Sequence, residues 1–246
     1  GIDNNCNGRI DEGFIDANGK YRSNEHCGFC NNDCSKYWSL TLQHATGTCD
    51  ASPAMPVCKM TCQGDDGTGH EWVDVNKDTA DGCECRRVTG NTTVDIPDQF
   101  PTYPAPGATY VDENCDGIDG VIDGAMFVSA QAAAGGDGSM QRPYRTIDEA
   151  LATFPRPDRK HILVAEGTYR ENVMLQPGVG IYGGYSVDFR QRDIVLHVSI
   201  IDGQESSGQT SGPRAAVHAE GLGGQTTVLS GFRILGYDVS TATPDD

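Results

Sequence analysis

The chain has 246 residues, a mass of 26.3 kDa and a formal net charge of −17, with 31 glycines and 10 cysteines. No apolar run reaches the roughly 18 residues that a membrane-spanning helix needs. So large a negative charge also disfavours the clustered lysines and arginines that bind a nucleic-acid backbone. The composition therefore predicts neither membrane insertion nor a nucleic-acid partner, and the high glycine content favours strands and turns.

The cysteines divide the chain into two regions. All of them precede residue 116: Cys6, Cys27, Cys30, Cys34, Cys49, Cys58, Cys62, Cys83, Cys85 and Cys115. We predict a cysteine-rich acidic region over residues 1–107, whose last part (88–107) is a proline-rich linker, and a second region over 108–246. The linker could instead pack on the second region as an extra strand, because Val94 and Ile96 alternate with polar residues.

The even, dense set of cysteines indicates a disulfide framework made in an oxidising compartment. The first region is poor in large apolar residues, so cross-links and bound ions are expected to replace a core. Sequence leaves the pairing open. A zinc site built from Cys27, Cys30 and Cys34 with the pair Cys83 and Cys85 is the alternative, but an acidic exported region favours disulfides at all ten positions.

Two acidic loops have the spacing of calcium-binding loops, with oxygen ligands at alternate positions and glycine at position 6. In the first loop the predicted ligands are Asp3, Asn5, Asn7, Asp11 and the carbonyl of Arg9. In the second loop they are Asp112, Asn114, Asp116, Asp119, Asp123 and the carbonyl of Ile118. Neither loop shows flanking amphipathic helices, and position 12 of the first loop is Phe14. We predict calcium loops without a helical hand; the alternative is a pair of turns rich in Asp and Asn.

A third acidic stretch repeats part of this pattern. Its candidate ligands are Asp74, Asn76, Asp78 and Asp81. It lacks glycine at position 6, so a calcium loop and a solvated acidic turn both stay open. Ca²⁺ is the one cofactor that the sequence predicts.

The segments GIDNNCNGRIDEG and VDENCDGIDG resemble the metal-binding motif of the MopE family, which occurs in surface and secreted proteins of myxobacteria and related Gram-negative bacteria. CGFCNNDC and DVNKDTADGCEC resemble the cysteine-rich segments that accompany it. The resemblance implies an exported, metal-binding surface module and no enzyme. The copper association in the family name is not carried over, because carboxylates and amides are hard ligands and neither loop contains His or Met.

The second region predicts stacked β-strands. Thr146 and Glu149 form a capping box for an amphipathic helix of two to three turns that ends before Pro155. Short apolar strands are predicted at 126–129, 162–164, 173–175, 179–182, 198–201, 216–218, 228–229 and 232–234. Register positions 164, 181, 200, 217 and 234 are separated by 17, 19, 17 and 17 residues. This near-constant period favours a parallel β-solenoid over an antiparallel sandwich.

PYRTIDEAL, ILVAEGTYRENVML, GVGIYGGY and SIIDG resemble the N-terminal cap and first coils of pectin-lyase-like proteins. The resemblance implies a mainly β fold, a short right-handed parallel β-helix with an N-terminal capping helix, preceded by the disulfide-rich, calcium-binding region. It implies no lyase activity, since fold and chemistry are separable. Asp188, Asp193 and Arg192 form no recognisable catalytic signature.

These observations predict a non-catalytic protein of the bacterial cell surface or exterior, structural or adhesive, stiffened by calcium and disulfides. Its partners would be further copies in a fibre or coat, another surface protein or a polysaccharide. The alternatives are a polysaccharide-binding or lyase-like β-helix module and a copper- or metal-scavenging surface protein.

Overall fold

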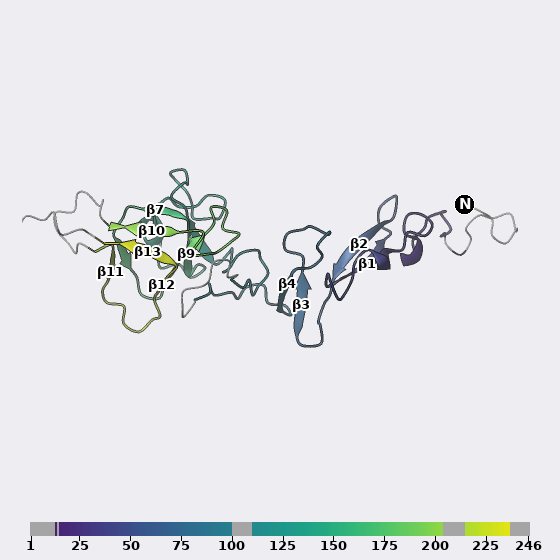
Figure 1. Ribbon diagram of the computed structural model, residues 1–246, viewed down its shortest axis with the longest axis horizontal. Helices are drawn as coiled ribbons and strands as arrows, with labels where there is room; N and C mark the ends of the chain where they lie inside the picture. Colours follow the sequence, from purple (N-terminus) through teal and green to yellow (C-terminus); the bar gives the residue numbers. More distant parts are fainter. Residues whose placement is uncertain (1–12, 14, 100–109, 204–214, 237–246) are drawn as a thin grey trace, which may run out of the picture. The chain divides into compact units, whose positions relative to one another are not determined.

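The computed structural model describes residues 13, 15–99, 110–203 and 215–236, and it is mainly β (Figure 1). The chain forms two compact units, Gly1–Thr92 and Thr93–Asp246. The border lies earlier than the predicted one at residue 107, because the segment after Thr93 packs on the second unit. There the Asp98 amide donates to the Asp119 carboxylate at 3.0 Å.

The segment 93–99 contains no strand, so it does not form the extra strand that the alternation of Val94 and Ile96 would allow. These two side chains are 63% and 61% exposed, whereas Asp95 is 3% exposed. Pro97 is also buried. The apolar side chains therefore face outward and a carboxylate faces inward, the reverse of the predicted pattern.

In its described residues, unit 1 consists of two antiparallel strand pairs and two 3-10 turns. Strand β1 (Ala45–Asp50) pairs with β2 (Val57–Cys62), and β3 (His70–Val73) pairs with β4 (Cys85–Val88). The turns are η1 (Asn24–His26) and η2 (Cys34–Lys36). Turn η2 lies directly on β1, since a Cβ at Gly47 would overlap the carbonyl oxygen of Cys34. Unit 1 has few buried apolar side chains, and most of them are half-cystines. This is expected for a region in which cross-links replace a hydrophobic core.

The described part of unit 2 contains three parallel sheets. The largest has the order β12-β9-β6-β5, from strands Val228–Ser230, Gly180–Tyr185, His161–Ala165 and Ala125–Val128. The second has the order β13-β10-β7, from Phe232–Leu235, Ser199–Asp202 and Gly167–Tyr169. The third pairs β11 (Val217–Ala219) with β8 (Val173–Leu175). Strands β6, β7 and β8 follow one another in the chain but enter different sheets, and β9, β10 and β11 stack on them in the same order. Figure 1 shows one of these stacks, β7, β10 and β13.

The predicted strands exist, but their 17-residue period is wrong. In β10, Ser199 lies opposite Gly167 on one side and Phe232 on the other, so stacked neighbours are nearly twice as far apart in sequence as predicted. The predicted register positions 181, 200 and 217 lie in three different sheets. The prediction also missed β7, because Gly167–Tyr169 is three residues long and resembles a turn.

The capping box of helix α1 (Ile147–Leu151) is confirmed. Thr146 accepts from the Glu149 amide, and the Glu149 carboxylate accepts from the Thr146 amide. The helix has five residues, fewer than predicted, because Thr153 and Phe154 continue in tighter turns that bond three residues back. Its side chains Ile147, Ala150 and Leu151 enter the core.

The four-stranded sheet is buried on both faces. Ile162 and Val164 of β6 point into the main core, which lies between the sheets. Leu163 and Ala165, which alternate with them, join a second cluster with Phe127, Tyr182, Tyr185 and Phe189. Burial of both faces explains why β6 reads as a continuous apolar run. Ile118, from the second acidic loop, belongs to this second cluster, so the loop is fixed to the outer face of the sheet.

Candidate metal site

The second acidic loop folds around three of its predicted ligands. The Asp112 carboxylate accepts from the Gly117 amide at 2.8 Å and from the Asp116 amide at 3.2 Å. Asn114 accepts from the same Asp116 amide at 2.9 Å. Asp116 accepts from the amides of Ile118 and Ile122. Positions 1, 3 and 5 are thus held by the backbone of the turn that they enclose.

Glycine is needed at position 6 of this loop. Gly117 has φ = 100°, a conformation that side chains with a Cβ rarely adopt. Cys115 at position 4 also has a positive φ and is disulfide-bonded. A bend at position 6 and a covalent tie at position 4 together fix the loop without flanking helices.

The loop gathers negative charge in a partly buried place. Burial raises the pKa of the Asp112 carboxyl, and the amides of Gly117 and Asp116 act in the opposite sense. Burial also raises the pKa of Asp116, and the charge of Asp112 adds to that effect. The Asn114 amide group, 1% exposed, donates to Asp116 at 3.2 Å. Two partly desolvated carboxylates and an amide are a ligand set suited to a hard cation such as Ca²⁺.

Asp119, at position 8, faces away from this set. Its carboxylate forms an ion pair with Arg192 at 2.7 Å, with both side chains at least 96% buried. Burial raises the pKa of Asp119 to about 6 even though Arg192 acts to lower it. Of the other predicted ligands, Asp123 is exposed and Ile118 is 2% exposed. The structure therefore brings together Asp112, Asn114 and Asp116, and gives Asp119 an anchoring contact.

Arg192 was not predicted as part of this site. Its guanidinium lies 4.5 Å from the ring centre of Tyr110, 5.4 Å from that of Tyr182 and 5.2 Å from that of Tyr185. It also donates to the carbonyl oxygens of Asp98 and Gly183. Nothing in local spacing indicates this role, because Arg192 is far from the loop in sequence and was considered only as a catalytic base.

The third acidic stretch is an exposed chain of turns. Asp74 accepts from the Lys77 amide, Asn76 accepts from the Asp78 amide, and Asp78 accepts from the Ala80 amide. Asn76 donates to Asp81 at 2.8 Å. Glu84 accepts from the amides of Val75 and Asn76. In this stretch most of these side chains accept a hydrogen bond from a nearby backbone amide at an exposed position. The first loop, with Asp3, Asn5, Asn7, Arg9 and Asp11, lies outside the described residues.

Three disulfides cross-link unit 1: Cys27–Cys49, Cys34–Cys58 and Cys62–Cys83. Cys85 and Cys115 are also disulfide-bonded, and Cys6 lies outside the described residues. Cys30 is exposed with a free thiol, so the disulfide predicted at this position is absent from the part of the chain that the structure describes.

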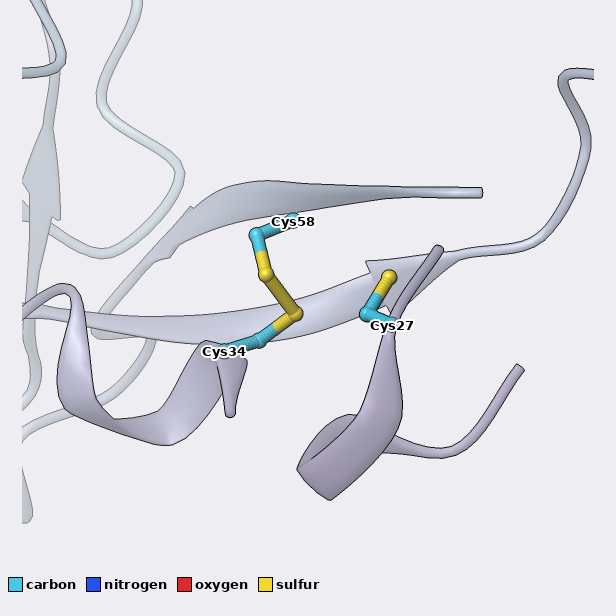
Figure 2. A group of neighbouring side chains, drawn as sticks. All are labelled: Cys27, Cys34 and Cys58. Atoms are coloured by element: carbon cyan, nitrogen blue, oxygen red, sulfur yellow. A yellow bond between two sulfur atoms is a disulfide. The ribbon is translucent and has the colours of Figure 1, made fainter. Parts of the chain in front are cut away.

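Cys27, Cys34 and Cys58 form a sulfur cluster with all three sulfur atoms within 4.8 Å of one another (Figure 2). Cys49 and Cys58 face each other across the β1–β2 pair, and each is bonded to one end of the turn 27–34. Three such sulfurs could hold a metal ion when reduced, but a disulfide sulfur is not the thiolate that metals bind. In the oxidised protein the cluster is a double cross-link. It omits Cys30, which the predicted zinc alternative required.

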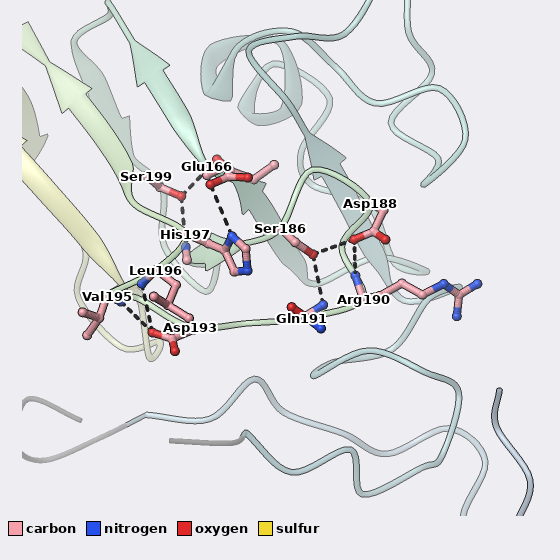
Figure 3. Close-up of polar contacts among 12 residues, drawn as sticks. Glu166, Ser186, Asp188, Arg190, Gln191, Asp193, Val195, Leu196, His197 and Ser199 are labelled. Atoms are coloured by element: carbon pink, nitrogen blue, oxygen red, sulfur yellow. Dashed lines mark hydrogen bonds and ion pairs between the residues drawn. The ribbon is translucent and has the colours of Figure 1, made fainter. Parts of the chain in front are cut away.

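The loop between β9 and β10 contains the acids that sequence weighed for catalysis (Figure 3). Asp188 accepts from the Ser186 hydroxyl at 2.6 Å, and Asp193 accepts from the amides of Val195 and Leu196. His197 lies 3.2 Å from Glu166. Each of these aspartates shapes its own turn, and neither faces the other's carboxylate in Figure 3.

No protein-family model matches the chain, and no curated protein or solved structure matches it either. Among the described residues, no helix is both long and apolar enough to cross a membrane. The multiple disulfides indicate folding in an oxidising environment.

Proposed function

We propose that this chain is a non-catalytic structural or adhesive protein of the bacterial cell surface, stiffened by calcium in unit 2 and by disulfides in unit 1. The observation that carries the proposal is the geometry of the loop at Asp112–Asp116. Its acidic side chains converge on one turn and are partly desolvated. The resemblance to the metal-binding motif of exported proteins supports the same assignment.

The loop is placed to act as a clamp on the β-body. Ile118 packs into the cluster on the outer face of the large sheet, and the Tyr185 hydroxyl donates to the Asp119 carbonyl at 2.6 Å. Calcium that tightens the loop would therefore stabilise the sheet beneath it. A ligand at 100 times its Kd stabilises the folded state by about 2.7 kcal/mol.

The body itself supports a scaffold role. Its three parallel sheets each end on a strand of the last described pass, β11, β12 or β13. We propose that these sheets form a short right-handed β-helix in unit 2. Strand edges at one end of such a stack favour pairing with further strands, and we propose a second copy as the partner.

Thermal unfolding in calcium and in EGTA tests the calcium role. We expect calcium to raise the Tm by roughly 5–10 °C, and the double variant Asp112→Asn with Asp116→Asn to abolish that rise. The matched control is Asp158→Asn, an exposed carboxylate outside the acidic loop, paired with Arg156 at 3.3 Å. It should keep the full response.

Equal melting in calcium and EGTA would overturn the calcium role, and so would elemental analysis that finds copper in the purified protein. Sedimentation at high protein concentration in calcium tests the partner. Larger assemblies are expected, and monomers alone would contradict self-association.

A further inference from the structure

Four cysteines of unit 1 come together in one place. Cys34 is bonded to Cys58, and Cys27 is bonded to Cys49. The sulfur atoms of Cys27, Cys34 and Cys58 all lie within 4.8 Å of one another, and Figure 2 shows Cys27 beside the Cys34–Cys58 bond. Cys27 is bonded to neither of the other two, so the fold brings its sulfur there. The fold thus gathers more sulfur at one point than either cross-link requires.

Two structural elements place these sulfurs. Cys49 and Cys58 are directly opposite each other in the antiparallel pair β1–β2, where the Cβ atoms of such a pair lie about 4.5–5.5 Å apart. Cys27 and Cys34 lie at the two ends of one turn, in which the Cys27 amide donates to the Asn32 carbonyl at 3.0 Å. Backbone hydrogen bonds, as well as the disulfides, therefore hold the parts of the chain that carry the cluster.

The side chain of Asn32 is directed at the cluster. Its amide group donates to the Cys27 carbonyl and to the Cys58 sulfur, the latter at 3.7 Å. The Tyr37 hydroxyl donates to the Asn32 Oδ1 at 2.7 Å and so orients the amide group toward the sulfur. Such a positioned donor stabilises a sulfur that carries negative charge, as hydrogen bonds to the thiolate ligands of metal sites do.

The cluster is sheltered but has a partly open side. Cys27 and Cys34 are both 0% exposed, whereas Cys49 and Cys58 are half-buried. In a tetrahedral zinc–thiolate site the metal–sulfur distance is about 2.3 Å, which places the sulfurs about 3.8 Å apart. After reduction, sulfurs that lie within 4.8 Å of one another need only small side-chain rotations to reach that spacing. Four cysteines are a common ligand set for such a site.

We propose that these four cysteines bind one thiophilic divalent ion, Zn²⁺, when the chain is reduced. The chain is made before its disulfides form, so each molecule passes through a state with free thiols. The four thiols release four protons to the solvent as the ion binds the thiolates. Two external disulfides would later oxidise the four thiolates to the two cross-links, become four thiolates themselves, and release the ion. This site is independent of the calcium loop in unit 2.

Hydrogen exchange of the full chain tests the proposal. A phosphine and water reduce each disulfide to two thiols, and the phosphine becomes its oxide; the reduced chain then receives either EDTA or Zn²⁺. We expect Zn²⁺ to slow the exchange of the β1 and β2 amides at least tenfold relative to EDTA. Zn²⁺ that binds thiols of an unfolded chain gives no such protection. In the oxidised chain, Zn²⁺ should leave the exchange of these amides unchanged.

Two double variants show whether the effect belongs to this cluster. Cys34→Ala with Cys58→Ala removes two ligands and should abolish the zinc-dependent protection. The matched control, Cys62→Ala with Cys83→Ala, removes the cysteines of the third disulfide, whose sulfurs are outside the cluster, and should keep it. Co²⁺ gives a second measurement: the visible absorption of a tetrahedral sulfur site should appear in the reduced wild type and the control but not in the first variant.

Absence of zinc-dependent protection in the reduced wild type would overturn the proposal, whatever the variants do. Equal protection and equal Co²⁺ absorption in the two variants would also overturn it, because the bound ion would then not depend on this cluster.

Discussion

The two units differ in the aspartates that they bury: unit 2 removes several carboxylates from water, whereas hydrogen bonds lower the pKa of the shifted aspartates described in unit 1. In unit 1, Asp66 accepts from Thr68 and Arg86, and these bonds hold the pKa of its carboxyl far below the ordinary value. In unit 2, burial raises the pKa of Asp95, Asp112, Asp116 and Asp119. The comparison shows that an acidic composition alone does not identify a metal site. What distinguishes the second unit is a set of carboxylates removed from water.

The two units also differ in what they bury. Unit 1 buries half-cystines, whereas unit 2 buries aliphatic and aromatic side chains in two clusters. A reductant should therefore destabilise unit 1 more than unit 2. We expect a phosphine reductant to remove hydrogen-exchange protection from β1 and β2 and to leave that of β6 and β9, because loss of one native disulfide from a small region typically costs about 2–5 kcal/mol.

Mass spectrometry of exchanged peptides, with and without the reductant, measures this difference. The double variant Cys34→Ala with Cys58→Ala removes one cross-link in the absence of reductant and should show the same selective loss. Equal loss of protection in both units would mean that unit 2 also depends on its disulfide at Cys115.

The buried ion pair is specific to unit 2 and gives the second-largest expected effect. Arg192→Met removes the base and leaves the Asp119 carboxyl buried without its partner, so that it must stay charged or take up a proton, and this should lower the free energy of unfolding by about 3–5 kcal/mol. Denaturant unfolding measures this loss. Adding Asp119→Asn should recover part of it, since the unpaired carboxyl is then gone. A loss under about 1 kcal/mol would show that water reaches Asp119 in the variant.

Sequence reasoning succeeded where the signal is local. The capping box at Thr146 and the apolar runs of the strands lie within a few residues, and the structure confirms both. The metal ligands predicted at Asp112, Asn114 and Asp116 stay a prediction, although their side chains enclose one turn. It failed where the signal depends on which strands stack. Ser199 pairs with Gly167 across loops of unequal length. Because the loops differ in length, paired residues are not separated by a constant number of residues.

The same reason explains the residues that were missed around the loop. Asp95 and Arg192 reach it from other parts of the chain, and neither carries a local motif. A buried carboxylate in a linker between Val94 and Ile96 contradicts the usual alternation, and only the folded arrangement shows that Asp95 faces inward.

The pH dependence of folding stability should also differ between the two units. Glu171 accepts from the amides of Ile147 and Asp148, yet burial raises its pKa to about 7. The folded state then holds a proton that the unfolded chain releases near pH 4.5. This contribution to stability is fully present below about pH 4.5 and is lost as the pH rises through about 7.

Glu171→Gln should remove that component, which amounts to about 1–3 kcal/mol. The measurement is the difference in unfolding free energy between the wild type and Glu171→Gln at pH 4.5 and at pH 8, because other buried acids contribute equally to both proteins. A constant difference across this range would show that the helix amides keep Glu171 ionised throughout.

The smallest expected effect concerns Thr146, the N-cap residue of helix α1. Thr146→Ala removes the hydroxyl that accepts from the Glu149 amide and should lower the unfolding free energy of unit 2 by about 1 kcal/mol. Thr146→Ser keeps the acceptor and is the matched control, expected to stay within about 0.5 kcal/mol of the wild type. Because Glu171 already accepts from the first two helix amides, α1 has two separate caps. If Thr146→Ala is neutral while Glu171→Gln changes the pH response, the buried carboxylate alone fixes the start of the helix. The capping box would then mark the helix in the sequence without stabilising it.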